Sequence, residues 1–180
     1  MIFEPFPIFL PSEYRVKFAT EAWERREAAK LRRQVFCDEQ GIFAGDDRDA
    51  MDDIAIPIVA ISSLGVALED VVGTVRIHEA EPCIWWGSRL AVAKAYRRIG
   101  AIGTSLIRLA VCSANARGCR AFFAYVQSQN ALLFQRLHWH TIEERELHGR
   151  PHHFMRADLA YYPPIANAEI GFVSLPKMAA

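Results

Sequence analysis

The sequence predicts an α/β protein of the α+β kind, in which helices flank one central mixed β-sheet. The first observation is a set of short runs rich in Val, Ile and aromatic residues, which are typical of strands. The second is a series of stretches with apolar residues at helical spacing, the later ones lying between strands. Strands that come first, a helix over them, and then alternating strands and helices are typical of a mixed sheet covered on both faces.

Composition limits the class of protein. The length of 180 residues and the hydrophobic content of 52% suit one domain with a proper core. The net charge is zero, so nothing indicates a nucleic-acid partner. No apolar run is long enough to span a membrane, and the proline-rich N-terminus lacks the basic start of a secretory signal. The cysteines show no Cys-x-x-Cys spacing. We therefore expect a reduced, cytoplasmic protein that binds neither nucleic acid nor membrane.

The first half of the chain is predicted to hold several strands and one helix. Residues 14–18 alternate between polar and apolar and form the first strand. A helix runs from its cap at Thr20 to about Phe36, with acidic residues in its first turn. The acidic segment 45–53 is predicted to be a solvated loop or one that faces the substrate. Further strands are expected at residues 56–63, 71–78 and 83–92.

The second half is predicted to alternate before it ends in a hairpin. A helix at 102–116 stops before Gly118, since glycine accepts the left-handed conformation just past a helix end. A strand at 121–127 and a shorter helix capped by Ser128 follow, and then a hairpin of strands at 139–147 and 152–159. The predicted organisation is an apolar N-terminal extension, one domain and a C-terminal tail, at residues 1–13, 14–160 and 161–180.

One stretch predicts a binding site for phosphate. The end of a strand at 90–92 leads into a basic, glycine-containing turn and then into the helix that starts near 102. The first turn of a helix has unpaired backbone N–H groups and a partial positive charge, which together attract anions. Gly100 and Gly103 allow close approach to the backbone, and Arg97 and Arg98 can supply charge-assisted hydrogen bonds. The glycine spacings of nucleoside triphosphate and dinucleotide loops are absent.

The segment 98–103, Arg-Ile-Gly-Ala-Ile-Gly, resembles the pyrophosphate loop of the GNAT superfamily, the acyl-CoA-dependent N-acyltransferases. That loop reads Arg/Gln-x-x-Gly-x-Gly/Ala, and Ala101 stands where its first glycine is usual. Residues 31–42 resemble the first helix of members that carry Arg-x-x-Val-Phe-x-x-Glu-Gln, and residues 126–139 resemble the closing Asn-containing element. Together the resemblance covers residues 14–160 and extends to a small group of bacterial N-acetyltransferases assigned from sequence.

The resemblance implies a GNAT-like fold and transfer of an acetyl or acyl group from acetyl-CoA to a primary amine of a small molecule by direct attack. It implies acetyl-CoA as co-substrate and no metal. It places the pantetheine arm along Leu90, Ala91 and Val92. The further residues that it assigns to the co-substrate are Arg97, Arg98, Ile99, Gly100, Ala101, Ile102, Gly103, Thr104, Asn130 and Phe134.

The catalytic groups depart from the pattern of the family. The usual tyrosine aligns with Phe134, which cannot donate a proton to the leaving thiolate. Water, a helix dipole, Tyr125, Ser105 or a histidine can replace it, or the domain binds CoA without catalysis. The position of a glutamate kept by some relatives holds Trp85 or Trp86, which we interpret as core or acceptor-pocket walls.

Glu39, where the first helix ends, is the predicted general base. His78 and Glu79 are weaker candidates. The acidic residues at 46–53 hint at a cationic amine as acceptor. Histidine pairs at 138 and 140 and at 152 and 153 are interpreted as polar surface rather than metal ligands, and Cys112 and Cys119 as small hydrophobic residues rather than nucleophiles.

Three functions remain open from the sequence. The first is an N-acetyltransferase, and its alternative is a non-catalytic acyl-CoA-binding, sensing or scaffold domain with the same fold. The third is an acyl-homoserine-lactone synthase, because the Arg-x-x-Val-Phe element also occurs in proteins related to those enzymes. The apolar N-terminal arm and tail indicate a possible homodimer.

Overall fold

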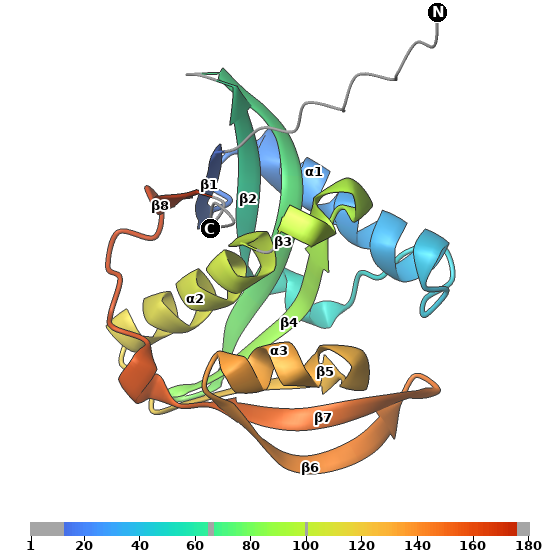
Figure 1. Ribbon diagram of the computed structural model, residues 1–180, viewed down its shortest axis with the longest axis vertical. Helices are drawn as coiled ribbons and strands as arrows, with labels where there is room; N and C mark the ends of the chain where they lie inside the picture. Colours follow the sequence, from blue (N-terminus) through green and yellow to red (C-terminus); the bar gives the residue numbers. More distant parts are fainter. Residues whose placement is uncertain (1–12, 65–66, 100, 176–180) are drawn as a thin grey trace, which may run out of the picture.

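The computed structural model describes residues 13–64, 67–99 and 101–175, and within them it contains one eight-stranded sheet in the order β6-β7-β5-β4-β3-β2-β1-β8 (Figure 1). β4 and β5 run parallel, and the other adjacent strands whose pairing is described run antiparallel. The predicted mixed sheet is therefore confirmed. The strands are β1 (Glu13–Phe18), β2 (Ile56–Leu64), β3 (Ala67–Glu81), β4 (Ile84–Val92), β5 (Ala121–Gln127), β6 (Trp139–Leu147), β7 (Arg150–Ala157) and β8 (Phe172–Ser174).

Helices cover both faces of this sheet. α1 (Ala22–Arg33) continues into a π-helical turn, η1 (Gln34–Glu39), and lies on one face, while α2 (Ala101–Ala116) and α3 (Ala131–Arg136) lie on the other (Figure 1). The sequence of β2 is apolar almost throughout because the strand is covered on both faces. Ile58 belongs to the core cluster that contains the α2 side chains, and the next residue, Val59, belongs to the cluster beneath α1. Successive side chains of a strand point to opposite faces, so both faces of β2 are buried.

α1 begins one residue later than predicted. Its N-cap is Glu21, which forms a capping box with Glu24, whereas the hydroxyl of Thr20 accepts a hydrogen bond from Lys17 at 2.9 Å. Lys17 also donates to the buried Glu24 carboxylate at 2.6 Å. The paired charges satisfy each other inside the protein and fix the start of the helix against β1.

α2 lies directly on β3 at Gly73. A Cβ at this position would stand 2.7 Å from Cγ2 of Ile102, so only glycine lets the helix approach this closely. Gly73 is in register with Val92, the last residue of β4. The contact therefore places the first turn of α2 beside the end of β4. None of the helices in the described residues combines the length and hydrophobicity that crossing a membrane requires.

The C-terminal segment takes part in the fold as far as it is described. β8 pairs with β1 and completes one edge of the sheet. The buried Tyr162 hydroxyl donates to the Leu137 carbonyl at 2.5 Å and accepts from Nε1 of Trp139 at 3.0 Å. Residues 161–175, part of the predicted C-terminal tail, therefore contribute a strand and core contacts to the fold. The predicted N-terminal extension lies outside the described residues, apart from Glu13 at the start of β1.

Candidate active site

The parallel strands β4 and β5 separate halfway along their length. Ile84–Gly87 pairs with Ala121–Ala124, and beyond this point β4 pairs only with β3 while β5 pairs only with β7. Where the strands part, β4 carries a bulge, since Ser88 is in register with Arg76 and Ala91 with Thr74. Arg89, inside the bulge, has a φ of 56°. The last five residues of β4 therefore present one edge of backbone groups that no described strand pairs.

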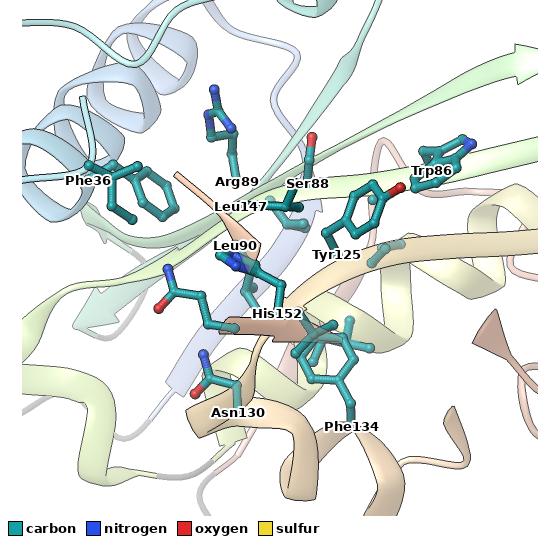
Figure 2. A pocket seen from close by; sticks show the side chains of 18 of the residues that line it. Phe36, Trp86, Ser88, Arg89, Leu90, Tyr125, Asn130, Phe134, Leu147 and His152 are labelled. Carbon is teal, nitrogen blue, oxygen red and sulfur yellow. The ribbon is translucent and has the colours of Figure 1, made fainter. Parts of the chain in front are cut away.

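A cavity of about 260 Å³ occupies this gap between the strands (Figure 2). Its walls come from both separated strands, from Phe36 of η1 and Phe43 after it, and from Phe134 of α3. Phe134 belongs to the core beneath α2 and α3. His78 and Trp86 also line the cavity, but they follow core residues in their strands and so point to the opposite face. The cavity therefore reaches both faces of the sheet.

The predicted CoA residues lie in one region, though only some of them line the cavity. Leu90, Asn130 and Phe134 do so. Ala91 and Val92 continue β4 beyond it, and a 3₁₀ helix, η3 (Lys94–Ile99), follows. The remaining assigned residues are Arg97, Arg98 and Ile99 in η3 and Ala101, Ile102, Gly103 and Thr104 in the first turn of α2, while Gly100 lies outside the described residues. The order of strand, basic turn and helix is as predicted.

The two arginines of η3 differ in their surroundings. Nε of Arg97 donates to the Val92 carbonyl at 2.9 Å, and its Nη2 donates to the Glu39 carboxylate at 2.6 Å. Arg98 is exposed and has no hydrogen-bond or ion-pair partner among the described residues. Glu39, the predicted base, is not among the residues that line the cavity. Its carboxylate instead contacts an arginine of the predicted pyrophosphate turn.

The acidic segment after α1 is mostly paired within the protein. Asp47, 2% exposed, accepts hydrogen bonds from Nε of Arg32 at 2.8 Å and Nε of Arg89 at 3.0 Å. Asp49 accepts two from Arg76, at 2.7 and 2.8 Å. The prediction of a solvated or substrate-facing loop is therefore wrong for Asp47, whereas Asp49 is exposed but still paired with an arginine.

The same arginines change how these carboxylates titrate. The hydrogen bonds from Arg76 hold the pKa of Asp49 below its usual range. Burial disfavours the charged form of Asp52, but hydrogen bonds from Arg32, the Asp49 backbone and Arg76 outweigh it and hold its pKa well below the usual range. These carboxylates are thus ionised at neutral pH and are occupied by structural contacts.

Histidines supply the proton-accepting groups of the cavity. Among the described residues that line it there is no Asp or Glu, but His78, His148 and His152 are present. His152 is 7% exposed, and its Nδ1 lies 2.9 Å from the Arg150 carbonyl. Burial lowers the pKa of His78, and the nearby Arg76 cation lowers it further, so the neutral imidazole is favoured.

Four aromatic rings form a continuous surface beside the cavity, which we call the aromatic wall: Trp86, Phe123, Tyr125 and Phe154. Their neighbouring centroids are 5.2 to 5.5 Å apart, and Trp86 stacks on Phe154 with an interplanar angle of 11°. Trp86 and Tyr125 line the cavity (Figure 2), whereas Trp85 is 4% exposed and belongs to the core. Trp85 is thus a core residue, one of the two predicted roles, and Trp86 lines the cavity.

Several other residues considered for catalysis are engaged in packing or in hydrogen bonds within the protein. Phe134 is buried and packs edge-on against Trp139 at 5.0 Å, as expected of a core aromatic. Ser105 is hydrogen-bonded to Ser174 at 2.8 Å and does not line the cavity. Burial raises the pKa of Cys112, and that of Cys119 to about 11, so both thiols are protonated at neutral pH. Among the described residues, no group of His, Cys, Asp and Glu is placed to hold a metal.

The site thus combines a mixed sheet whose parallel pair separates over a cavity with a 3₁₀ turn and a helix that follow the open strand. The sequence model of the acetyltransferase (GNAT) family matches residues 20–139, and the chain belongs to this family. It is therefore an acyl-CoA-dependent acyltransferase, and the resemblance found in its motifs is confirmed. No curated protein sequence matches the chain significantly.

Solved structures share the fold at low sequence identity. A candidate N-acetyltransferase from Lactobacillus plantarum has a TM-score of 0.71 and 21% identity, covering 81% of this chain and 98% of that one. ElaA from Escherichia coli has a TM-score of 0.66 and 19% identity, with coverage of 81% and 98%. The CoA-dependent acyl-homoserine lactone synthase BjaI has a TM-score of 0.66 and 14% identity, with coverage of 81% and 83%. These identities show a common fold.

Proposed function

We propose that the protein transfers an acetyl group from acetyl-CoA to the primary amine of a small molecule by direct attack of the amine on the thioester. The observation that carries the proposal is the open edge of β4 at 88–92, with a cavity at its start and the first turn of α2 at its end. An extended chain that bears amide groups can pair with such an edge as a strand does. Pantetheine has this character.

The donor is held at both ends of this edge. The pyrophosphate lies at the first turn of α2, because the N-terminal end of a helix favours an anion through its backbone N–H groups and its dipole. Arg98 adds a cation with no competing partner among the described residues, whereas Arg97 is engaged with Glu39 and Val92. A Cβ at Gly103 would meet only Val92, at 3.9 Å, so the surface at this turn is open.

The thioester then lies at the bulge of β4. The amine nitrogen attacks the carbonyl carbon, and the carbon–sulfur bond breaks as the amide forms. Backbone N–H groups of 90–92 face the oxygen on which negative charge develops. A thiolate whose conjugate acid has a pKa near 8.5 is a good leaving group, so the absence of a hydroxyl at Phe134 does not prevent the reaction.

The acceptor enters from the face of the sheet opposite to α3. There the cavity is bordered by the aromatic wall and by His78, while the α3 side is closed by Phe134 and Trp139. A small amine with an apolar body fits this surface, because rings contribute contact area without charge.

A thiol-release assay tests the proposal. Purified protein is incubated with acetyl-CoA and a panel of amines, and free CoA thiol and acetylated amine are both measured. Turnover with at least one amine is expected. Saturable binding of acetyl-CoA without thiol release would favour the non-catalytic alternative. S-adenosylmethionine is included as an acceptor, because its use would favour the homoserine-lactone synthase alternative.

A matched pair of charge reversals tests where the pyrophosphate lies. Arg98→Glu should raise the calorimetric Kd for CoA about tenfold or more, since a charge-assisted contact contributes roughly 1.5–3 kcal/mol. Arg26→Glu makes the same change on an exposed position of α1 and should leave the Kd unchanged. Equal affinity of the two variants for CoA would contradict the assignment of the pyrophosphate to the turn after β4.

A further inference from the structure

We propose that His152 is the proton-transfer residue of this site, its Nε2 taking the proton from the attacking amine and delivering it to the departing thiolate. The proposal rests on the proposed acetyl transfer. It begins from the position of the residue, which is 7% exposed and lines the cavity between β4 and β5 (Figure 2). Its strand, β7, pairs with β5, so the ring reaches the gap from the side that β4 has left.

The hydrogen bond at Nδ1 determines the tautomer. Nδ1 lies 2.9 Å from the carbonyl oxygen of Arg150, and a carbonyl can only accept. Nδ1 therefore carries the hydrogen, and in the neutral ring the lone pair is on Nε2. Nε2 has no hydrogen-bond partner among the described residues. The Arg150 main chain is held in β7 by its pairing with Leu147 of β6, and its guanidinium donates to the carbonyl of Gln40 at 2.5 Å.

The other proton acceptors near the cavity are less suited. Glu39 does not line it and is paired with Arg97 at 2.6 Å. His148 lies in the exposed turn between β6 and β7, where its ring packs against Phe43. Nδ1 of His78 is buried and has no partner among the described residues, so no contact selects its tautomer. His152 alone among these groups combines burial, access to the cavity and a fixed tautomer.

The charged groups around His152 come from three elements. Arg145 is in register with it on β6 and forms an ion pair with Glu143. Arg150 lies two residues earlier on the same strand, and Gln127, in register on β5, is neutral. Across the cavity, Arg89 is paired with Asp47 and Asp49. None of the carboxylates among these groups lines the cavity, so no anion there competes for the proton.

One proton passes through the ring in each turnover. The nitrogen–carbon bond forms, an N–H proton moves to Nε2, and His152 becomes an imidazolium. As the carbon–sulfur bond breaks, the same proton moves from Nε2 to the sulfur. The products are the amide and free CoA thiol, and the ring returns to neutral. An imidazole can accept and return a proton near neutral pH, which Phe134 cannot do.

Substitution of His152 and of one matched histidine tests the role. His152→Gln should lower kcat about 100-fold or more at neutral pH, the usual contribution of a general acid–base group. The Kd for acetyl-CoA and the thermal midpoint should stay near those of His140→Gln, which changes an exposed histidine on β6 outside the cavity. The deficit should shrink at alkaline pH, where hydroxide takes the proton. Added imidazole should restore part of the activity of His152→Ala.

Wild-type kcat in His152→Gln, in a protein that acetylates an amine, would overturn the proposal and leave the acetyl transfer intact. A second measurement decides without turnover. In protein carrying ¹⁵N-histidine, the His152 signals, identified by their loss in His152→Gln, should show hydrogen on Nδ1 and a lone pair on Nε2. Acetyl-CoA should shift the Nε2 signal. The opposite tautomer, or an Nε2 signal that acetyl-CoA leaves unchanged, would exclude the role even if no acceptor is found.

Discussion

The carboxylate of Asp47 accepts a hydrogen bond from Nε of Arg89 at 3.0 Å and so joins the chain after α1 to the bulge of β4. Arg89 has a φ of 56°, a conformation that costs a non-glycine residue about 1 kcal/mol or more. Its guanidinium also lies 4.4 Å from the ring centroid of Phe43. The shape of the gap therefore depends on a buried aspartate outside it.

Asp47→Asn should destabilise the protein by about 1.5–3 kcal/mol, because Arg32 and Arg89 lose charge-assisted hydrogen bonds to a shared, buried carboxylate, although Asp52 and Asp49 remain as their other partners. Urea unfolding measures the difference. Asp53→Asn is the matched control, since Asp53 forms an exposed pair with Arg48 at 3.0 Å and such pairs contribute about 1 kcal/mol or less. A loss no larger than that of the control would show that Asp47 does not support the bulge.

Stability should fall in acid because of Asp49 and Asp52. The folded protein holds the pKa of both carboxyls below the value of about 3.9 expected in the unfolded chain. The unfolded state then binds more protons, so the stabilisation is present above that value and is lost as pH falls below it toward the folded pKa. Urea unfolding between about pH 5 and pH 2 should show this fall. Asp52→Asn should flatten it, and an unchanged slope would contradict the assignment.

Two glycine substitutions should distinguish the cost of a strained backbone conformation from the cost of a steric clash. Gly171 has a φ of 64°, and a Cβ there would lie 1.8 Å from the backbone oxygen of Val16. Gly149 has a φ of 69°, but a Cβ there would meet nothing within 4 Å. Gly149→Ala should therefore cost only the conformational strain of about 1 kcal/mol, whereas Gly171→Ala should cost clearly more and loosen β8 from β1. Thermal unfolding compares the two, and similar midpoints would contradict the packing at Gly171.

Trp86→Ala should weaken binding of the acceptor amine and leave binding of acetyl-CoA unchanged. Loss of a ring that contacts an apolar amine is expected to raise its KM about tenfold, while the Kd for acetyl-CoA stays unchanged. Tyr161→Ala is the control, because this ring is 57% exposed and does not line the cavity. Steady-state kinetics with the best amine of the panel measure the effect. An unchanged KM would place the acceptor elsewhere.

The sequence predicts well those elements whose own residues carry the full apolar pattern of a helix or strand. β5 spans Ala121–Gln127 as predicted, and the Gly118 stop agrees with α2 ending at Ala116. The sequence does not predict β8, because three residues are too few to show the alternation of a strand. β8 is defined by its pairing with β1. The start of α1 differs by one residue, since Lys17 engages the hydroxyl of the predicted cap.

Partners distant in sequence explain what was missed at the site. The acidic segment shows its charge in the sequence, but not that Arg76 and Arg89 lie against it. The sequence shows His152 only as one of a pair with His153, whereas its position at the cavity depends on β7 pairing with β5. The glycine turn and its helix could be predicted because phosphate binding there uses the main chain, whose course follows from local sequence.

The separation of β4 from β5 divides the sheet into two blocks, β8 with β1–β4 and β5–β7, that share only four residue pairs. Few backbone hydrogen bonds cross this boundary, so amide hydrogens along it should exchange before those deep in either block. A co-substrate bound between β4 and β5 would contact both blocks. The unfolding temperature should then rise as the concentration of the co-substrate is increased. Under the proposed function, the bound co-substrate would therefore add to the cohesion between the two blocks.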